Sequence, residues 1–485
     1  MPLQTKGVVN LKETTIKDKL SPENVVHLHG LHRENAPYLV MWVLYYTWVV
    51  AFATWWKVSP VANSAFDTQI RSSIHIVNLL SSAAFAFIIQ REWYVKALRI
   101  GSVLIVMSMI SFYALPSVSL KMFAAVSGAV IMGCVNICIL LSFVFTLNNT
   151  EKLYAVVSSN VLIQLVSLMN EHIPSGLVKS IISFALLIFS LSAVLFFRRE
   201  LSLVENPDVT SYKLVMSPRV YLSLFFNCVI VILCKGVGKG ILNIATVSAG
   251  SSIPTGYYIG GLAGCLVYVL VYAFIKKAYI WLGNLTFSGI AIGLLCDTFI
   301  PQAPGSAIPF AVFLGFGSAI GMINMYYIIG VIGKKYDSLH YIRMSILFIG
   351  ICGGTVGIIM GNMISRIGTI EISNSASVFS VVVMLAFMFV SPVMERAEYV
   401  NDWGLDSGNT EVGGSRLSLF KTYGLSKREA EVCELLLQGY TLRQISAILP
   451  IAYSTVNTYC TSAYRKLGIN SRTELLLKFK DLIIK

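Results

Sequence analysis

Small polar side chains recur on one side of a helix that the sequence predicts from about residue 454 to 467. Asn457, Thr458 and Thr461 fall on a single face of that helix. An asparagine amide can bond both polar atoms of an adenine edge, and a threonine offers a hydroxyl and a methyl group to neighbouring bases. The chemistry that this face favours is the reading of base edges in the major groove of double-stranded DNA.

Three further helices are predicted around this one. Ser426 followed by Glu429 is the pattern of a capping box, and it opens an amphipathic helix. Thr441 can cap a second short helix that ends before Pro450. A fourth helix is predicted from about 471 to 482, after a glycine that terminates the third. Two short helices joined by a tight turn form the helix-turn-helix geometry that places a helix in the major groove.

The charge of this C-terminal segment agrees with a polyanionic partner. From Arg416 to the end, eleven Lys or Arg residues stand against five acidic residues. Cations that neutralise phosphates supply most of the sequence-independent affinity for DNA. The alternative, a four-helix module that makes only protein contacts, does not require this surplus.

About 65 C-terminal residues resemble the LuxR-type helix-turn-helix family, through LSKREAEVCELLLQGY, STVNTY and RKLGINSRTELL. The resemblance implies that the segment binds DNA, with base contacts from Asn457, Thr458 and Thr461. It also implies dimers formed through the fourth helix, here Leu475, Leu476 and Phe479. The remaining residues of the implied interface, most of them phosphate contacts, are Arg443, Ser454, Thr455, Arg465, Lys466 and Arg472.

This sequence departs from the usual LuxR-type pattern in its third helix. Asn457 and Tyr459 stand where Lys and His are commoner, and Ala452 occupies the position of the usual capping serine. A reading face with fewer cations implies modest affinity of one copy for DNA.

The rest of the chain has the composition of a membrane protein. Of 485 residues, 56% are hydrophobic and 13% are charged, with a mean hydropathy of +0.72. A water-soluble chain of this length carries far more charge. Apolar stretches recur at close to the roughly 20 residues that a spanning helix needs. We predict twelve spans, at 38–56, 72–90, 97–115, 122–147, 153–169, 177–197, 220–244, 255–275, 280–300, 307–332, 341–364 and 376–393.

An even number of spans places both termini on one side, and a DNA-binding tail requires that side to be the cytoplasm. The polar residues 1–37 lack the pattern of a cleavable export signal, which agrees with a cytoplasmic N-terminus. The loops then placed inside hold 13 Lys or Arg residues and those placed outside hold 7. This asymmetry is the one that the positive-inside rule predicts. The resemblance to LuxR-type regulators of bacteria implies that this membrane is the bacterial inner membrane.

Six spans, a longer connection and six more spans resemble the major facilitator superfamily of transporters, whose two halves face each other across a central cavity. The loop IIQREWYVKALRIGS departs from the gating signature that the superfamily carries between its second and third helices. The expected fold is therefore all-α, a polytopic bundle of twelve membrane helices in a 6+6 arrangement followed by a soluble four-helix domain. Its segments are 1–37, 38–197, 198–218, 219–394, the flexible linker 395–419 and the DNA-binding domain 420–485.

Polar side chains at membrane depth are candidates for a ligand site, because burying them in lipid is costly. If helices one, four, seven and ten line the cavity, as the resemblance implies, an aromatic and amide lining with one cation would suit a small anionic or aromatic molecule. Each residue also has an ordinary structural explanation, since amides bridge helices and a lysine can snorkel to water. The candidates are Tyr45, Tyr46, Trp48, Asn136, Asn227, Lys235, Asn324, Tyr326 and Tyr327.

No catalytic constellation, cofactor motif or metal-ligand spacing is recognisable. The nine cysteines include no C-x-x-C pair, and His27, His29 and His32 have no suitable acidic or thiolate partners. We therefore expect neither an enzyme nor a bound cofactor or metal. Two functions remain: a one-component regulator that senses a small molecule through its membrane bundle, and a solute transporter with a fused regulatory tail.

Overall fold

The computed structural model divides the chain into two compact units, a large helical bundle and a small C-terminal helical domain. Most of the expected connection 198–218, the linker 395–419 and the twelfth span lie outside the described residues. The structure describes residues 31–51, 65–90, 93–172, 177–196, 228–238, 241–242, 252–275, 278–297, 307–335, 339–364, 382, 385, 420, 423–437, 440–449 and 451–479.

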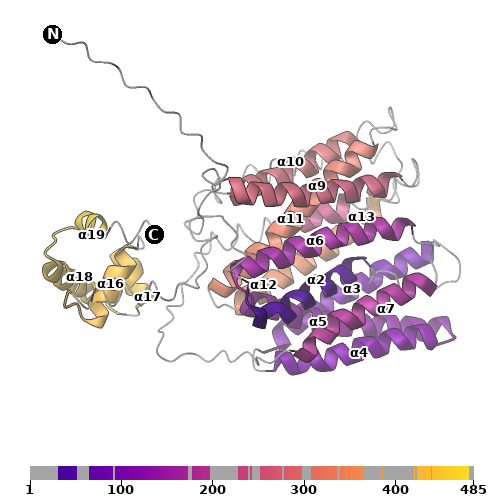
Figure 1. Ribbon diagram of the computed structural model, residues 1–485, viewed down its shortest axis with the longest axis horizontal. Helices are drawn as coiled ribbons and strands as arrows, with labels where there is room; N and C mark the ends of the chain where they lie inside the picture. Colours follow the sequence, from indigo (N-terminus) through magenta and orange to yellow (C-terminus); the bar gives the residue numbers. More distant parts are fainter. Residues whose placement is uncertain are drawn as a thin grey trace, which may run out of the picture. The chain divides into compact units, whose positions relative to one another are not determined.

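The first half of the bundle contains a helix at each of the six expected spans (Figure 1). These helices run side by side, and α2 packs against α5, α6 and α7. The elements are η2 (Arg33–Asn35), α2 (Ala36–Ala51), α3 (Ala65–Ile88), α4 (Tyr94–Ala114), α5 (Val118–Thr146), α6 (Asn149–His172), α7 (Leu177–Ser192) and η3 (Ala193–Phe196).

The second half contains helices at the next five expected spans. The eleventh span is interrupted by the π-helical segment η5, in a stretch rich in glycine. The elements are the helix Cys228–Gly238, α9 (Ser252–Phe274), α10 (Ala278–Asp297), α11 (Ala307–Lys335), α12 (Leu339–Leu347), η5 (Phe348–Thr355) and α13 (Val356–Ile364).

Several of these helices are long and apolar enough to cross a bilayer. Many of their outward side chains are large and hydrophobic, such as Phe123 and Leu266, whose exposed fractions are 74% and 62%. Exposed apolar surface of this extent is compatible with lipid and not with water. Within the described residues, six helices meet the length and composition of a membrane span: Tyr94–Ala114, Val118–Thr146, Asn149–Met169, Ile253–Phe274, Ala307–Lys334 and Tyr341–Gly361.

Glycines allow helix backbones to approach closely in the second half. A methyl group added at Gly236 would lie 2.5 Å from the carbonyl carbon of Gly357, and one at Gly353 would lie 3.1 Å from the Val229 carbonyl oxygen. Such close packing of small residues is the usual means by which membrane helices associate. Gly353 and Gly357 therefore form a packing seam, as their four-residue spacing indicates.

The two halves are joined by hydrogen bonds to carbonyl oxygens near the carboxyl ends of α3 and α5. Arg343 of α12 donates from Nε to the Ala86 carbonyl oxygen at 2.8 Å and from Nη2 to the Ile89 carbonyl oxygen at 3.2 Å. Lys334 of α11 donates to the Leu147 carbonyl oxygen at 2.9 Å. A cation at the carboxyl end of a helix is favoured by the unpaired carbonyls and by the helix dipole. These contacts hold the halves together at that end.

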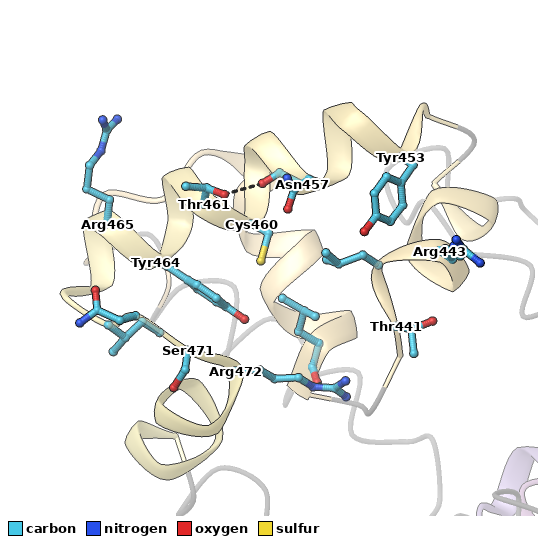
Figure 2. Close-up of a pocket in the computed structure, with 14 residues that line it drawn as sticks. Thr441, Arg443, Tyr453, Asn457, Cys460, Thr461, Tyr464, Arg465, Ser471 and Arg472 are labelled. Atoms are coloured by element: carbon cyan, nitrogen blue, oxygen red, sulfur yellow. Dashed lines mark hydrogen bonds between the residues drawn. The ribbon is translucent and has the colours of Figure 1, made fainter.

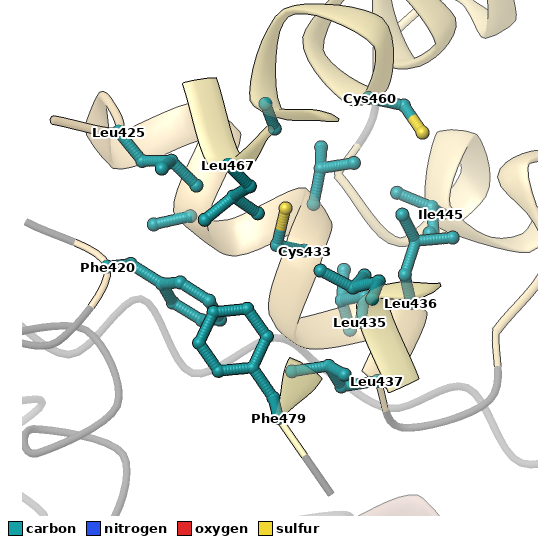
Figure 3. Close-up of a cluster of buried hydrophobic side chains, with 14 of the residues drawn as sticks. Phe420, Leu425, Cys433, Leu435, Leu436, Leu437, Ile445, Cys460, Leu467 and Phe479 are labelled. Atoms are coloured by element: carbon teal, nitrogen blue, oxygen red, sulfur yellow. The ribbon is translucent and has the colours of Figure 1, made fainter. Parts of the chain in front are cut away.

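The C-terminal domain consists of α16 (Lys427–Leu437), α17 (Leu442–Ile448), α18 (Tyr453–Leu467) and α19 (Arg472–Lys478) around a core of its own. Figure 3 shows side chains from these helices gathered in that core, with Phe420 and Phe479 in contact. The four helices begin and end within a few residues of the predicted positions. The predicted four-helix domain is thus confirmed.

Capping residues account for the ends of these helices. The Ser426 backbone N–H donates to Glu429 Oε2 at 2.7 Å, and the Glu429 N–H donates to Ser426 Oγ at 3.3 Å. Thr441 and Gln444 form a second capping box at the start of α17. Gly468 ends α18 in the left-handed conformation, with φ of 66°.

Candidate nucleic-acid interface and a membrane cavity

The exposed face of α18 has the composition predicted for a recognition helix. Ser454, Asn457, Thr458, Thr461 and Arg465 are all exposed. Their spacing of three to four residues places them on one face. The opposite face carries Val456, Cys460, Ala463 and Leu467, which are buried in the core. Burial of that apolar stripe fixes which way the polar face points.

The two threonines of this face have their hydroxyl protons occupied within the helix. Thr458 Oγ1 donates to the Ser454 carbonyl oxygen and Thr461 Oγ1 to the Asn457 carbonyl oxygen, both at 2.9 Å. Each hydroxyl oxygen keeps acceptor capacity, and each methyl group remains available. The threonines can therefore accept from a base amine or contact a thymine methyl group.

A concave surface of about 930 Å³ lies against α18. Figure 2 shows Arg443, Asn457, Thr461, Arg465 and Arg472 around it. They come from the start of α17, the length of α18 and the start of α19. No acidic residue occurs among the described residues that line it. The surface combines three arginines with the exposed amide of Asn457.

Two of the predicted phosphate contacts are engaged within the domain. Arg472 Nη2 donates to the Leu436 carbonyl oxygen at 3.3 Å, where α16 ends. Lys466 Nζ donates to Glu429 Oε2 at 2.6 Å. Both cations tie neighbouring helices together. Of the four cations predicted to bind phosphates, Arg443 and Arg465 therefore have fewer contacts within the domain that would compete with a phosphate. The phosphate roles of Lys466 and Arg472 stay predictions.

Glu429 is a buried carboxylate that links α16 to α18. Its side chain accepts from Ser462 Oγ at 2.6 Å and from Lys466, as well as from the Ser426 backbone. Burial raises the pKa of this carboxyl, but the hydrogen bonds from Lys466, Ser462 and Ser426 outweigh it and lower the pKa to about 2. The carboxylate is therefore ionised at neutral pH and fixes α18 on α16.

Two of the three residues predicted to form a dimer contact are buried in the core of the domain itself. Leu475 and Phe479 have exposed fractions of 0% and 4% and belong to the domain's own core. Phe479 lies edge-on against Phe420 and Tyr423. Their role as dimer contacts is wrong, because the fourth helix uses its apolar face to close this core. The side chain of Leu476 lies outside what the structure describes.

In the bundle, a cavity of about 50 Å³ lies between the two halves. It brings together two of the residues proposed from the sequence, Tyr46 and Lys235. The first half supplies α2 and α6, and the second supplies the helix Cys228–Gly238, α9 and α11. The lining residues are Tyr46, Val50, Asn160, Ile163, Gln164, Ser167, Lys235, Tyr257, Tyr258, Ser318, Ala319 and Met322.

Three other candidates form contacts inside the first half. Tyr45 Oη donates to Asn136 Oδ1 at 3.0 Å, and Asn136 Nδ2 donates to Asn78 Oδ1 at 3.0 Å. Trp48 is 1% exposed and donates to Ser183 Oγ at 3.1 Å. These side chains bridge helices and do not line the cavity.

The remaining candidates lie elsewhere on α11 or outside the described residues. Tyr326 packs edge-on against Tyr46, with ring centroids 5.0 Å apart, and Tyr327 Oη lies 3.2 Å from Tyr272 Oη. Asn324 is buried, and Asn227 lies outside the described residues. Of this group, Tyr326 contacts Tyr46, which lines the cavity.

Sequence reasoning missed the contribution of α6 to the cavity. Asn160, Gln164 and Ser167 line it and recur at i, i+4 and i+7. That pattern is a polar stripe on an otherwise apolar span, and it was visible in the sequence. The resemblance to transporters directed attention to helices one, four, seven and ten instead.

The C-terminal segment matches a known family. Residues 424–479 match the model of bacterial regulatory proteins of the luxR family. The segment is 39% identical over 54 residues to the spore germination protein GerE of Bacillus subtilis (strain 168), covering 73% of that protein and 11% of this chain. The chain therefore belongs to the luxR family of bacterial regulatory proteins, through a DNA-binding helix-turn-helix domain at its C-terminus.

A second relative shares the same segment. It is a protein of the exeN 3′ region of Aeromonas salmonicida, named as an HTH-type transcriptional regulator, and is 36% identical over 80 residues. The match covers 16% of this chain, and the chain spans 37% of the length of that relative. The similarity is therefore confined to the C-terminal segment of this chain.

The bundle is similar in fold to transporters of the major facilitator superfamily. It superposes on a bacterial homologue of the iron transporter ferroportin with a TM-score of 0.52 at 14% identity, covering 74% of this chain and all of that one. The superfamily member FucP in its outward conformation gives a TM-score of 0.50 at 12% identity, covering 74% of this chain and 99% of that one. The chain is a polytopic membrane protein with a transporter-like fold and a luxR-family tail.

Proposed function

We propose that the protein is a membrane-embedded one-component transcriptional regulator. A small molecule binds the bundle, shifts the population of its conformations and thereby changes how the C-terminal domain engages DNA. The observation that supports this proposal is the presence of a luxR-family DNA-binding domain and a transporter-like bundle on one chain. A ligand shifts such an equilibrium only by its difference in affinity for the two states, which limits the coupling to a few kcal/mol.

The proposed location is the inner membrane of a bacterium, with both termini in the cytoplasm. The distribution of Lys and Arg in the loops supports this orientation. Only there would the C-terminal domain reach chromosomal DNA. Lipid is then the partner of the outward apolar side chains.

In the proposed complex, Asn457, Thr458 and Thr461 contact bases, and Arg443 and Arg465 hold phosphates on either side. Ser454, Thr455, Lys466 and Arg472 complete the interface. The exposed face of α18 and the arginines around the concave surface support this assignment. A dimer on DNA remains part of the proposal, but its contacts must lie outside the buried face of α19.

Chromatin immunoprecipitation of the full-length chain from intact cells tests the proposal. We expect a small set of enriched promoters, whose transcripts change when the gene is deleted. Enrichment should be lost in Asn457→Ala and retained in the control variant Glu474→Gln, because Glu474 is exposed on α19 and does not line the concave surface. Uniform recovery of chromosomal DNA by both variants would contradict sequence-specific regulation.

The transporter-like fold favours a second function. In it, the bundle transports a solute and the C-terminal domain regulates the operon that encodes the protein. Uptake by proteoliposomes distinguishes the two functions. A regulator that only senses its ligand gives binding without accumulation. A transporter gives concentrative or exchange-driven uptake.

A further inference from the structure

The cavity between the halves lies at the middle of the bundle. Asn160 is midway along α6 (Asn149–His172), and Ser318 is midway along α11 (Ala307–Lys335). Helices from both halves supply its walls. A molecule held there contacts both halves at once, so its binding depends on how they are arranged.

The charge of the lining favours an anion. Lys235 is the cation of the site, and none of the described lining residues is acidic. The other polar groups are amides and hydroxyls. A ligand with a negative group can form a charge-assisted hydrogen bond with Lys235, whereas a positively charged ligand would be repelled by it.

One buried polar atom of the lining lacks a partner. Gln164 is 6% exposed, and its Oε1 accepts no hydrogen bond in the structure. An unsatisfied buried acceptor costs free energy that a ligand with an N–H or O–H donor recovers. The second requirement of the ligand is therefore a neutral donor.

The position of the Gln164 amide is fixed by the facing helix. A methyl group added at Gly261 of α9 would lie 2.5 Å from Gln164 Cδ and 2.7 Å from Oε1. The absence of a side chain at Gly261 thus leaves the space that the amide occupies. α6 belongs to the first half and α9 to the second, so this contact crosses between them.

The size of the cavity limits the ligand to a few heavy atoms. A volume of about 50 Å³ holds only a few water-sized groups. Large aromatic or sugar-like molecules do not fit this conformation. A short chain with one carboxylate does.

We propose that this cavity binds a short hydroxycarboxylate, whose carboxylate lies toward Lys235 and whose hydroxyl donates to Gln164 Oε1. The inference rests on the proposed sensing function and names its ligand class. An unsubstituted carboxylate leaves the Gln164 acceptor unpaired. An amino acid places an ammonium group where the hydroxyl lies, and this adds a second positive charge to a cavity that already holds Lys235.

The test uses the full-length protein in lipid nanodiscs, with glycolate, acetate and glycine as probes and thermal unfolding as the first readout. Glycolate should raise the unfolding temperature at millimolar concentration. Acetate should bind about tenfold more weakly, because it lacks the donor. Glycine should bind more weakly than glycolate. Equal binding of glycolate and acetate, or tighter binding of glycine, overturns the proposal.

Two variants separate the roles of the lining residues. Lys235→Met should weaken glycolate and acetate alike, by roughly thirtyfold or more. Gln164→Leu should remove the preference for glycolate over acetate while retaining acetate binding. Lys96→Met, at an exposed position of α4, is the matched control and should bind glycolate as the unaltered chain does. An unchanged glycolate-to-acetate ratio in Gln164→Leu contradicts the assignment.

Gly261→Ala provides an independent check, because it adds no polar group to the cavity. The added methyl group displaces the Gln164 amide, so the preference for glycolate should fall as it does in Gln164→Leu. A retained preference would contradict the proposed donor contact.

The same samples distinguish failure of the ligand site from failure of the proposed function. Binding of a promoter duplex is measured with and without glycolate. Glycolate binding without any effect on DNA affinity supports the site and contradicts sensing. If no probe stabilises the protein and none alters its DNA binding, the proposed ligand site is contradicted. The assignment of the DNA-binding domain is unaffected by that result.

Discussion

Asn457 and Arg465 lie on the same exposed face of α18 but offer different chemistry. The asparagine amide carries both a donor and an acceptor in one plane, which matches an adenine edge. The arginine presents donors only, and backbone phosphate oxygens occur at every nucleotide. The two residues should therefore differ in what their loss does to specificity.

We predict that Asn457→Ala weakens binding to the cognate duplex by about 1–3 kcal/mol and leaves binding to random duplex nearly unchanged. Arg465→Ala should weaken binding to both duplexes and reduce the salt dependence by about one ion. Fluorescence anisotropy of the full chain at several salt concentrations measures both effects. Equal losses on both duplexes for both variants would refute these roles.

Glu429 makes the stability of the C-terminal domain dependent on pH. Its pKa in the folded chain is about 2, against an ordinary value of 4.5, so the ionised form stabilises the fold. The stabilisation is complete above about pH 4.5 and is lost as the pH falls toward 2. The shift corresponds to about 3 kcal/mol. Hydrogen exchange of α16 in the full chain, corrected for intrinsic rates, should show protection falling over this range.

Glu429→Gln should lower this protection at neutral pH and flatten its dependence on acid. The matched variant Glu474→Gln, at an exposed carboxylate, should retain the dependence. A Glu429→Gln chain that keeps the same acid dependence would show that another group is responsible.

At the level of helices, the sequence predicted where a helix begins and ends better than it predicted what the apolar face of a helix packs against. Ser426, Thr441 and Gly468 determine caps by local chemistry, so their effects could be read without any tertiary information. The face of α19 could not be read in the same way. Leu475 and Phe479 form an apolar stripe that fits a dimer or a core equally well, and only the packing of Phe420 against Phe479 distinguishes them.

For the membrane helices too, the sequence predicted the spans but not which side chains form the candidate ligand site. Apolar length predicted the spans, because the bilayer sets that length. Which polar side chains converge depends on the rotation of each helix, which composition does not specify. Trp48 and Asn136 consequently bond within one half, while Gln164 of α6 lines the cavity.

The close approach of the helix Cys228–Gly238 to α13 should be sensitive to one methyl group. Gly236→Ala would place a carbon against the backbone of Gly357, which cannot move without separating the helices. We expect a loss of about 1–3 kcal/mol of stability. Thermal unfolding in nanodiscs measures it. Gly283→Ala in α10 is the control, because a methyl group there meets nothing within 4 Å; equal losses in both variants would contradict the packing seam.

At the scale of the whole chain, sensing requires two arrangements of the bundle with different consequences for the tail. Arg343 and Lys334 bond to helix ends of the opposite half and favour one arrangement. A ligand between the halves would change the balance, because it contacts both. The bundle has two halves in contact, and under the proposed function the luxR-family domain provides the output.

Under the proposed function, one chain is anchored in the membrane and presents its DNA-binding domain to the cytoplasm. Sealed vesicles of opposite orientation, prepared from cells that express the full chain, test it directly with a labelled promoter duplex. Inside-out vesicles should bind the duplex, and right-side-out vesicles should not. Binding only to right-side-out vesicles, or to neither kind, would contradict the account.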